Sequence, residues 1–298
     1  MLPRLALTLA FMLAVPAFAK AAPKPAPSSA KAPHAPYSFL PAQLKTKYLN
    51  MSFNAAGGET VQVKLDALQY QNPHYDMLDR GKVKDRMMAL VNADLKKDKE
   101  ALLALVAPYP LKTWDHIFQF VYTGEGTPEE IQVVLKLATR YKEKLGRGVL
   151  KKKPLKEGAF WNDKGSLSAS VQDFYWNNVG LNCNGFVGSY ARAVGTSQSP
   201  RTTILAYAPP ARRIKDLESL RPGDVIVWKD GKHIVAIQGK RADGNYDAVE
   251  SAGTASLQGL GSSVYEFKKA GPDLWNATPV SKSGRKGNPV PAYLASLK

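Results

Sequence analysis

Apolar and polar residues follow helical spacing through much of the first half of the chain. Over Lys82–Val106 the apolar positions recur every three or four residues, and Asp98 interrupts them. This pattern predicts two consecutive helices. Earlier, Glu59–Asp66 alternates apolar and polar residues, which predicts a half-buried strand. Residues 39–150 are therefore expected to form a mostly helical region.

The clearest helix signal covers Pro128–Leu145. Thr127 is a suitable N-cap, proline is favoured in the first helical turn, and Glu129 and Glu130 complement the positive end of the helix dipole. The apolar residues form one broad face. Gly146 provides a C-terminal stop.

The second half of the chain has a different pattern of apolar residues. A helix is predicted over Ser168–Trp176, and another begins near Asn182. Turn dipeptides then separate short apolar segments, which lie at Thr202–Tyr207, Asp224–Trp228, His233–Gln238, Tyr246–Ser251 and Ser263–Phe267. Helices followed by antiparallel strands predict an α+β fold over residues 151–298. The basic stretch Lys151–Pro154 is the expected domain boundary, and the alternative is a surface loop within one domain.

The beginning of the chain resembles an export signal. A short basic start precedes the apolar run Leu5–Val15, and Ala17–Ala19 has the small-x-small pattern of a cleavage site. We expect residues 1–19 to be a signal peptide and residues 20–38, rich in Ala, Pro and Lys, to be a tether. The alternative is a buried N-terminal helix. Periplasmic or secreted localisation follows, without a transmembrane segment in the mature form.

The charge balance favours an anionic partner. The chain carries 41 basic and 25 acidic side chains, a net charge of +16. For an exported protein, such a charge suits anionic wall polymers or membrane surfaces. The alternative is a solvated surface that only serves solubility. No nucleic-acid-binding motif is present, so a nucleic-acid partner is not expected.

The chain has a single cysteine, Cys183, which excludes an intramolecular disulfide and a multi-cysteine zinc site. Asn182 can cap a helix that begins at this cysteine, and Gly185 leaves space beside the sulfur. The N-terminus of a helix favours the thiolate, the form of cysteine that acts as a nucleophile. The alternative is a buried, inert cysteine.

A base and an orienting residue follow in the predicted strands. His233 comes directly after a tight turn, where a neutral imidazole can accept the thiol proton. On the next strand, Tyr246, Ala248 and Glu250 share one face. Glu250 is the candidate that orients the imidazole. The other histidines, His34, His74 and His116, have no such context.

Three segments together resemble the NlpC/P60 peptidases. Residues 182–187, Asn-Cys-Asn-Gly-Phe-Val, are similar to the family's Asp-Cys-Ser-Gly-Phe-Val nucleophile motif. Residues 220–225, Leu-Arg-Pro-Gly-Asp-Val, resemble its Leu-x-Pro-Gly-Asp-Leu strand, and residues 232–237, Lys-His-Ile-Val-Ala-Ile, resemble its histidine block. Tyr175 and Trp176 are similar to an aromatic pair that precedes the family's cysteine. The resemblance covers roughly residues 168–251.

This resemblance implies a papain-like core, in which the nucleophile helix packs on an antiparallel sheet. It also implies hydrolysis of amide bonds in peptidoglycan stem peptides, without a metal or organic cofactor. Asn182, Tyr175 and Trp176 become candidate substrate-binding residues. The chain departs from the family in having a neutral Asn182 where an aspartate often binds a free amine. Glu250 is closer to the related CHAP amidases.

Three alternatives remain at this point. The chain could be a papain-fold wall-binding protein without activity, a papain-like amidase or acyltransferase that acts on another substrate, or a purely structural wall protein.

Overall fold

The computed structural model describes residues 37–68, 77–107, 109–110, 113–146, 161–196, 202–254 and 257–298. These residues all belong to one compact unit, which spans residues 34–298. The expected signal peptide, most of the expected tether and the basic stretch Lys151–Pro154 lie outside the described residues. Within the described ranges, no helix has the length and apolar character that crossing a membrane requires.

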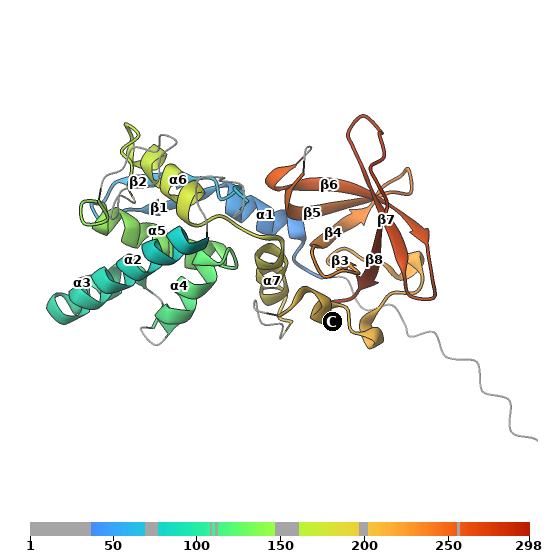
Figure 1. Cartoon of the computed structure of the whole chain (residues 1–298), viewed down its shortest axis with the longest axis horizontal. Coiled ribbons are helices and arrows are strands. Elements are labelled where there is room, and N and C mark those ends of the chain that lie inside the picture. Colours follow the sequence, from blue (N-terminus) through green and yellow to red (C-terminus); the bar gives the residue numbers. More distant parts are fainter. Residues whose placement is uncertain are drawn as a thin grey trace, which may run out of the picture. The chain divides into compact units, whose positions relative to one another are not determined.

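The first part of the unit is largely helical (Figure 1). Its elements are α1 (Pro41–Leu49), β1 (Met51–Asn54), β2 (Thr60–Val63), α2 (Met77–Lys97), α3 (Lys99–Val106), α4 (Trp114–Tyr122) and α5 (Pro128–Tyr141). The predicted break at Asp98 is confirmed, because its side chain accepts a hydrogen bond from Ala101 N and caps α3. Thr127 and Glu130 form the capping box of α5.

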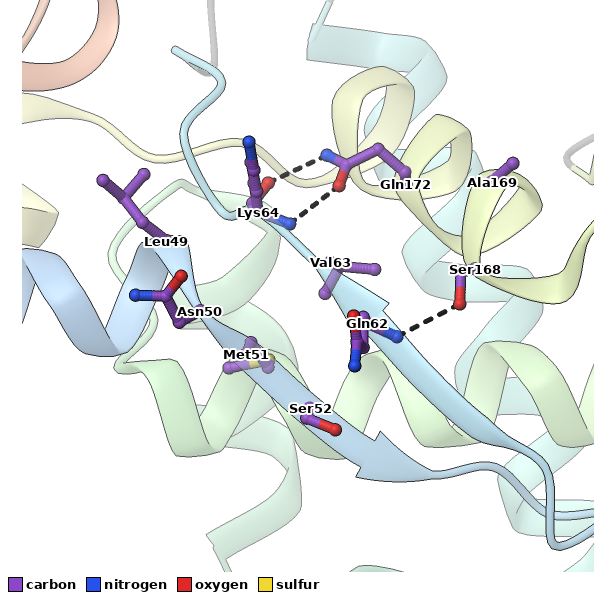
Figure 2. A pocket seen from close by; sticks show the side chains of 10 residues that line it. All are labelled: Leu49, Asn50, Met51, Ser52, Gln62, Val63, Lys64, Ser168, Ala169 and Gln172. Carbon is purple, nitrogen blue, oxygen red and sulfur yellow. Dashed lines mark hydrogen bonds between the residues drawn. The ribbon is translucent and has the colours of Figure 1, made fainter.

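The strand predicted over Glu59–Asp66 is real but shorter, and β2 pairs with β1, which the pattern did not predict. Helix α6 (Leu167–Asn178) covers the outer edge of β2 with side chains (Figure 2). The Gln172 carboxamide donates to Lys64 O and accepts from Lys64 N, both at 2.8 Å, and Ser168 Oγ accepts from Gln62 N. A groove of about 540 Å³ lies beside these contacts.

The second part is a closed antiparallel barrel. Its strands are β3 (Val225–Trp228), β4 (Ile234–Lys240), β5 (Tyr246–Gly253), β6 (Gln258–Lys269), β7 (Trp275–Val280) and β8 (Val290–Ala295). Each strand pairs with the next, and β8 pairs with β3 to close the ring. Figure 1 shows these strands, in orange and red, wrapping around one another.

The predicted papain-like core is therefore wrong. The sequence signals ended at Phe267, so β7 and β8 were missed, and Pro279 and Pro291 within them weaken the strand pattern. Pairing of β3 with β8 joins segments far apart in the chain, which no local pattern reports. The strand predicted over Thr202–Tyr207 is also wrong, since Ile204–Tyr207 forms a 3₁₀ helix, η2.

Alternate strand residues divide the barrel into two apolar faces. Ile226 and Val235 belong to an inner cluster of strand side chains, whereas Val225, Val227 and Ile234 join the large cluster that includes the helices. This alternation is the period of two expected for strands with both faces buried. Helix α7 (Cys183–Ala193) packs on the outer face at β4 and β5.

A close backbone contact joins α7 to the loop between α4 and α5. A Cβ atom at Gly185 would lie 2.0 Å from Gly124 O and 2.7 Å from Glu125 Cα. Only glycine permits this approach. The distance between α7 and the α4–α5 loop is therefore set by the missing side chain at position 185.

Substitution Gly185→Ala is expected to lower the free energy of unfolding by about 1–3 kcal/mol, because the added methyl group forces the α4–α5 loop away from α7. Urea denaturation measures the loss. Gly81→Ala is the matched control: nothing lies within 4 Å of a Cβ at this helical position. That control should gain about 0.5–1 kcal/mol. A Gly185→Ala protein as stable as wild type would contradict the close contact.

Candidate functional site

Cys183 is the first residue of α7 and is partly buried. Asn182 caps the helix, because its Oδ1 accepts a hydrogen bond from Gly185 N at 2.5 Å. Its Nδ2 donates to Thr123 O at 2.8 Å, and its backbone N–H donates to Gly124 O at 2.9 Å. The Asn182 side chain thus fixes both the helix start and the neighbouring loop. The positive end of the α7 dipole lies at the thiol.

His233 lies directly before β4 and is 9% exposed. Its Nε2 lies 2.5 Å from Glu250 Oε2, on the adjacent strand β5. The Cys183 side chain is the other group that acts on the imidazole, and it favours the charged form. Because Nε2 is engaged with Glu250, Nδ1 is the ring nitrogen left for the sulfur. Trp228 contacts the ring edge-on, with 4.8 Å between the ring centroids.

Hydrogen bonds raise the pKa of His233. Burial alone disfavours the charged imidazole and lowers this pKa, but hydrogen bonds with Cys183 and Glu250 and their charges outweigh burial, and raise the pKa from 6.5 to about 10. Burial raises the pKa of the Glu250 carboxyl, but the hydrogen bond and charge of His233, together with further hydrogen bonds to the carboxylate, outweigh burial and lower this pKa. At neutral pH the geometry thus favours an imidazolium paired with a carboxylate.

The structure brings Cys183, His233 and Glu250 together, from α7, the start of β4 and β5. This is the order of nucleophile, base and orienting group that cysteine and serine hydrolases use. Among the described residues, no group of three or more His, Cys, Asp or Glu side chains is arranged to hold a metal ion.

The α4–α5 loop brings a side chain to the site that sequence reasoning missed. Glu125 Oε1 accepts a hydrogen bond from Asn184 Nδ2 at 3.3 Å, although these residues are 59 positions apart. The same amide donates to Thr202 O, next to η2. No local signal marks Glu125, because its place depends on the packing of α7 against the loop.

The predicted aromatic pair divides between two environments. Tyr175 is fully buried, and its hydroxyl donates to Ala67 O at 3.4 Å. Trp176 is 50% exposed, and its Nε1 donates to Asp66 Oδ1 at 3.3 Å. Only Trp176 presents a large surface to a ligand. Of the remaining histidines, His116 stacks on Phe120, and His34 and His74 lie outside the described residues.

Substitution Glu250→Gln is expected to lower the pKa of His233 well below 10, because the imidazolium loses its charged partner. An NMR titration of the imidazole measures the change. Asp247→Asn is the matched control, since it removes one carboxylate from the same strand at a position whose partner is Arg241. That control should leave the pKa of His233 unchanged. An unchanged pKa in Glu250→Gln would contradict the ion pair.

The pair also makes folding stability depend on pH. The folded pKa of His233 is raised, so its contribution is fully present below pH 6.5 and is lost as pH rises through about 10. The folded pKa of Glu250 is lowered, so its contribution is present above about pH 4.5 and is lost as pH falls through the lowered value. The difference in the free energy of unfolding between wild type and Glu250→Gln, measured in urea, should therefore be largest between about pH 4.5 and pH 6.5. A pH-independent difference would contradict the coupling.

Comparison with protein-family models, with curated proteins and with solved structures finds no match to this chain. The chemistry of the site is therefore argued from its own geometry and from the sequence motifs.

Proposed function

We propose that this chain is a cysteine hydrolase that cleaves amide bonds, with Cys183 as the nucleophile. The observation that supports this function best is the buried pair of His233 and Glu250, with Nε2 and Oε2 2.5 Å apart, beside a Cys183 side chain that raises the pKa of the imidazole. A purely structural cysteine needs neither an imidazole on its sulfur nor a carboxylate behind that imidazole. An imidazolium beside the sulfur favours the thiolate that attacks a carbonyl.

In the acylation step, the Cys183 sulfur forms a bond to the carbonyl carbon of the substrate. His233 then gives its proton to the amide nitrogen as the carbon–nitrogen bond breaks, which releases the amine and leaves a thioester. Backbone N–H groups at the start of α7, including that of Cys183, would hold the oxyanion. Water then attacks the thioester and His233 accepts one of its protons. The carbon–sulfur bond breaks, the carboxylic acid leaves, and the thiolate and imidazolium are restored.

The proposed substrate class is the stem peptide of peptidoglycan, cleaved by endopeptidase or amidase action. Three ordered motifs around Cys183, Pro222 and His233 support this class through their resemblance to NlpC/P60 peptidases, and the net charge of +16 suits an anionic wall polymer. Asn182 is neutral, and both ends of its amide are hydrogen-bonded. Recognition of a free amine by this side chain is therefore not part of the proposed function.

Purified peptidoglycan incubated with the wild-type protein should release new fragments, and Cys183→Ala should abolish them, because the variant has no nucleophile. Mass spectrometry of the fragments identifies the cleaved bond. Lys232→Ala is a useful control, since this exposed neighbour of His233 forms an ion pair with Asp230. It should retain cleavage.

Failure of the folded wild-type protein to release fragments would reject wall hydrolysis. Co-sedimentation of the same protein with peptidoglycan would then favour a binding role. Fragments released equally by Cys183→Ala would reject the cysteine mechanism.

A further inference from the structure

The carboxylate of Glu250 has a second buried partner. Tyr265, on the neighbouring strand β6, donates its hydroxyl to Glu250 Oε1 at 3.1 Å and lies 3.3 Å from Oε2. Both residues are 4% exposed. The hydrogen bonds that join His233 to Glu250 thus continue to a further residue, which the sequence analysis did not single out.

The strand register explains how this contact forms. Glu250 is opposite Gly261, and Tyr265 is opposite Tyr246, four residues further from the site on each strand. Gly261 and Tyr265 have the same parity on β6, so both face the barrel interior, and the long phenol extends back to the carboxylate. The ring of Tyr265 stacks on Phe267, with 6.4 Å between centroids and 11° between planes. That packing restricts where the hydroxyl can lie.

We propose that Tyr265 is a positioning residue, which holds the Glu250 carboxylate ionised and oriented so that His233 can serve Cys183. This role rests on the proposed cysteine chemistry. Tyr265 touches neither the sulfur nor a substrate, and acts only through Glu250.

The energetic reason is the burial of Glu250. An ionised carboxylate out of water is unstable unless donors satisfy its oxygens. His233, directly before β4, supplies one donor, and Tyr265 supplies another from β6. Removal of the phenol therefore leaves the buried charge with weaker support.

Tyr265 is suited to be a permanent donor. Burial, followed by the charge and hydrogen bond of Glu250, raises the pKa of its hydroxyl well above 10. The phenol therefore stays protonated wherever thiol chemistry operates, and the carboxylate cannot lose this donor by titration.

The test is the pH dependence of Cys183 alkylation by iodoacetamide in wild type and Tyr265→Phe. Cys183 is the only cysteine, so the reaction reports this sulfur alone. In the variant, Glu250 becomes protonated at a higher pH and no longer supports the imidazolium. The acidic limb of the alkylation profile should therefore move up by about one pH unit. An acidic limb at the wild-type pH would overturn the proposal.

Tyr246→Phe is the matched control. Tyr246 is also a buried barrel tyrosine, but its hydroxyl donates to Leu217 O at 3.2 Å. This variant loses the same atom from the same region and should leave the acidic limb unmoved. An equal shift in both variants would indicate a general effect of barrel destabilisation and reject the role of Tyr265.

A double-substitution cycle separates positioning from general structural support. If Tyr265 acts through Glu250, Tyr265→Phe should cause no further fall in alkylation rate in a Glu250→Gln background. Independent, multiplying effects would overturn the proposal. Thermal denaturation establishes that each variant is folded at the assay temperature.

Should Tyr265→Phe not fold, a ¹³C NMR titration of the Glu250 carboxyl in the wild-type protein replaces that variant. A pKa of Glu250 at or above its ordinary value would overturn the proposal.

Alkylation requires no peptidoglycan, so the two proposals fail separately. A shifted acidic limb without wall fragments would retain Tyr265 as a positioning residue and reject the substrate. Wall fragments with an unmoved limb would retain the hydrolase and reject Tyr265.

Discussion

The buried pairing of His233 with Glu250 is the interaction on which the candidate site depends. Each partner alone would be costly, since burial disfavours both the imidazolium and the carboxylate. Together they reverse that effect, and the pKa of His233 rises to about 10 although burial opposes it. The barrel makes the pairing possible, because β4 and β5 lie side by side and present both groups at one end of the ring.

A second constraint sets the position of the sulfur. Helix α7 begins at Cys183, and its first turn is tied to the α4–α5 loop by Asn182 and by the close approach at Gly185. The helical part of the chain thus contributes to the site directly, since its α4–α5 loop holds the start of α7, where Cys183 lies. Glu125, on the same loop, reaches Asn184 beside the cysteine. A change in the packing of α4 and α5 would therefore move the start of α7 and, with it, the Cys183 thiol.

Burial increases from Cys183 through His233 to Glu250 and Tyr265. The thiol is partly exposed, the imidazole is 9% exposed, and Glu250 and Tyr265 are 4% exposed. Cys183 is thus less shielded than the groups behind it. Away from water, hydrogen bonds to a charged group are stronger. This gradient suits an acyl-transfer site, in which a substrate approaches the sulfur and leaves the supporting pair undisturbed.

The sequence by itself determined the features that depend on neighbours along the chain. The caps at Asp98, Thr127 and Asn182, and the cysteine at the start of a helix, follow from side chains within a few positions of one another. Period-two spacing correctly placed Glu250 on the same strand face as Tyr246 and Ala248. The role of these site residues in catalysis stays a prediction.

Tertiary structure decided what depends on distant pairing. Closure of the barrel requires β8 to meet β3, and the segments that form β7 and β8 carry prolines that obscure their strand pattern. The register of β5 against β6 brings Tyr265 to Glu250, and helix packing brings Glu125 to Asn184. A local pattern records propensity and periodicity, whereas these contacts arise only when burial selects one arrangement of the whole chain.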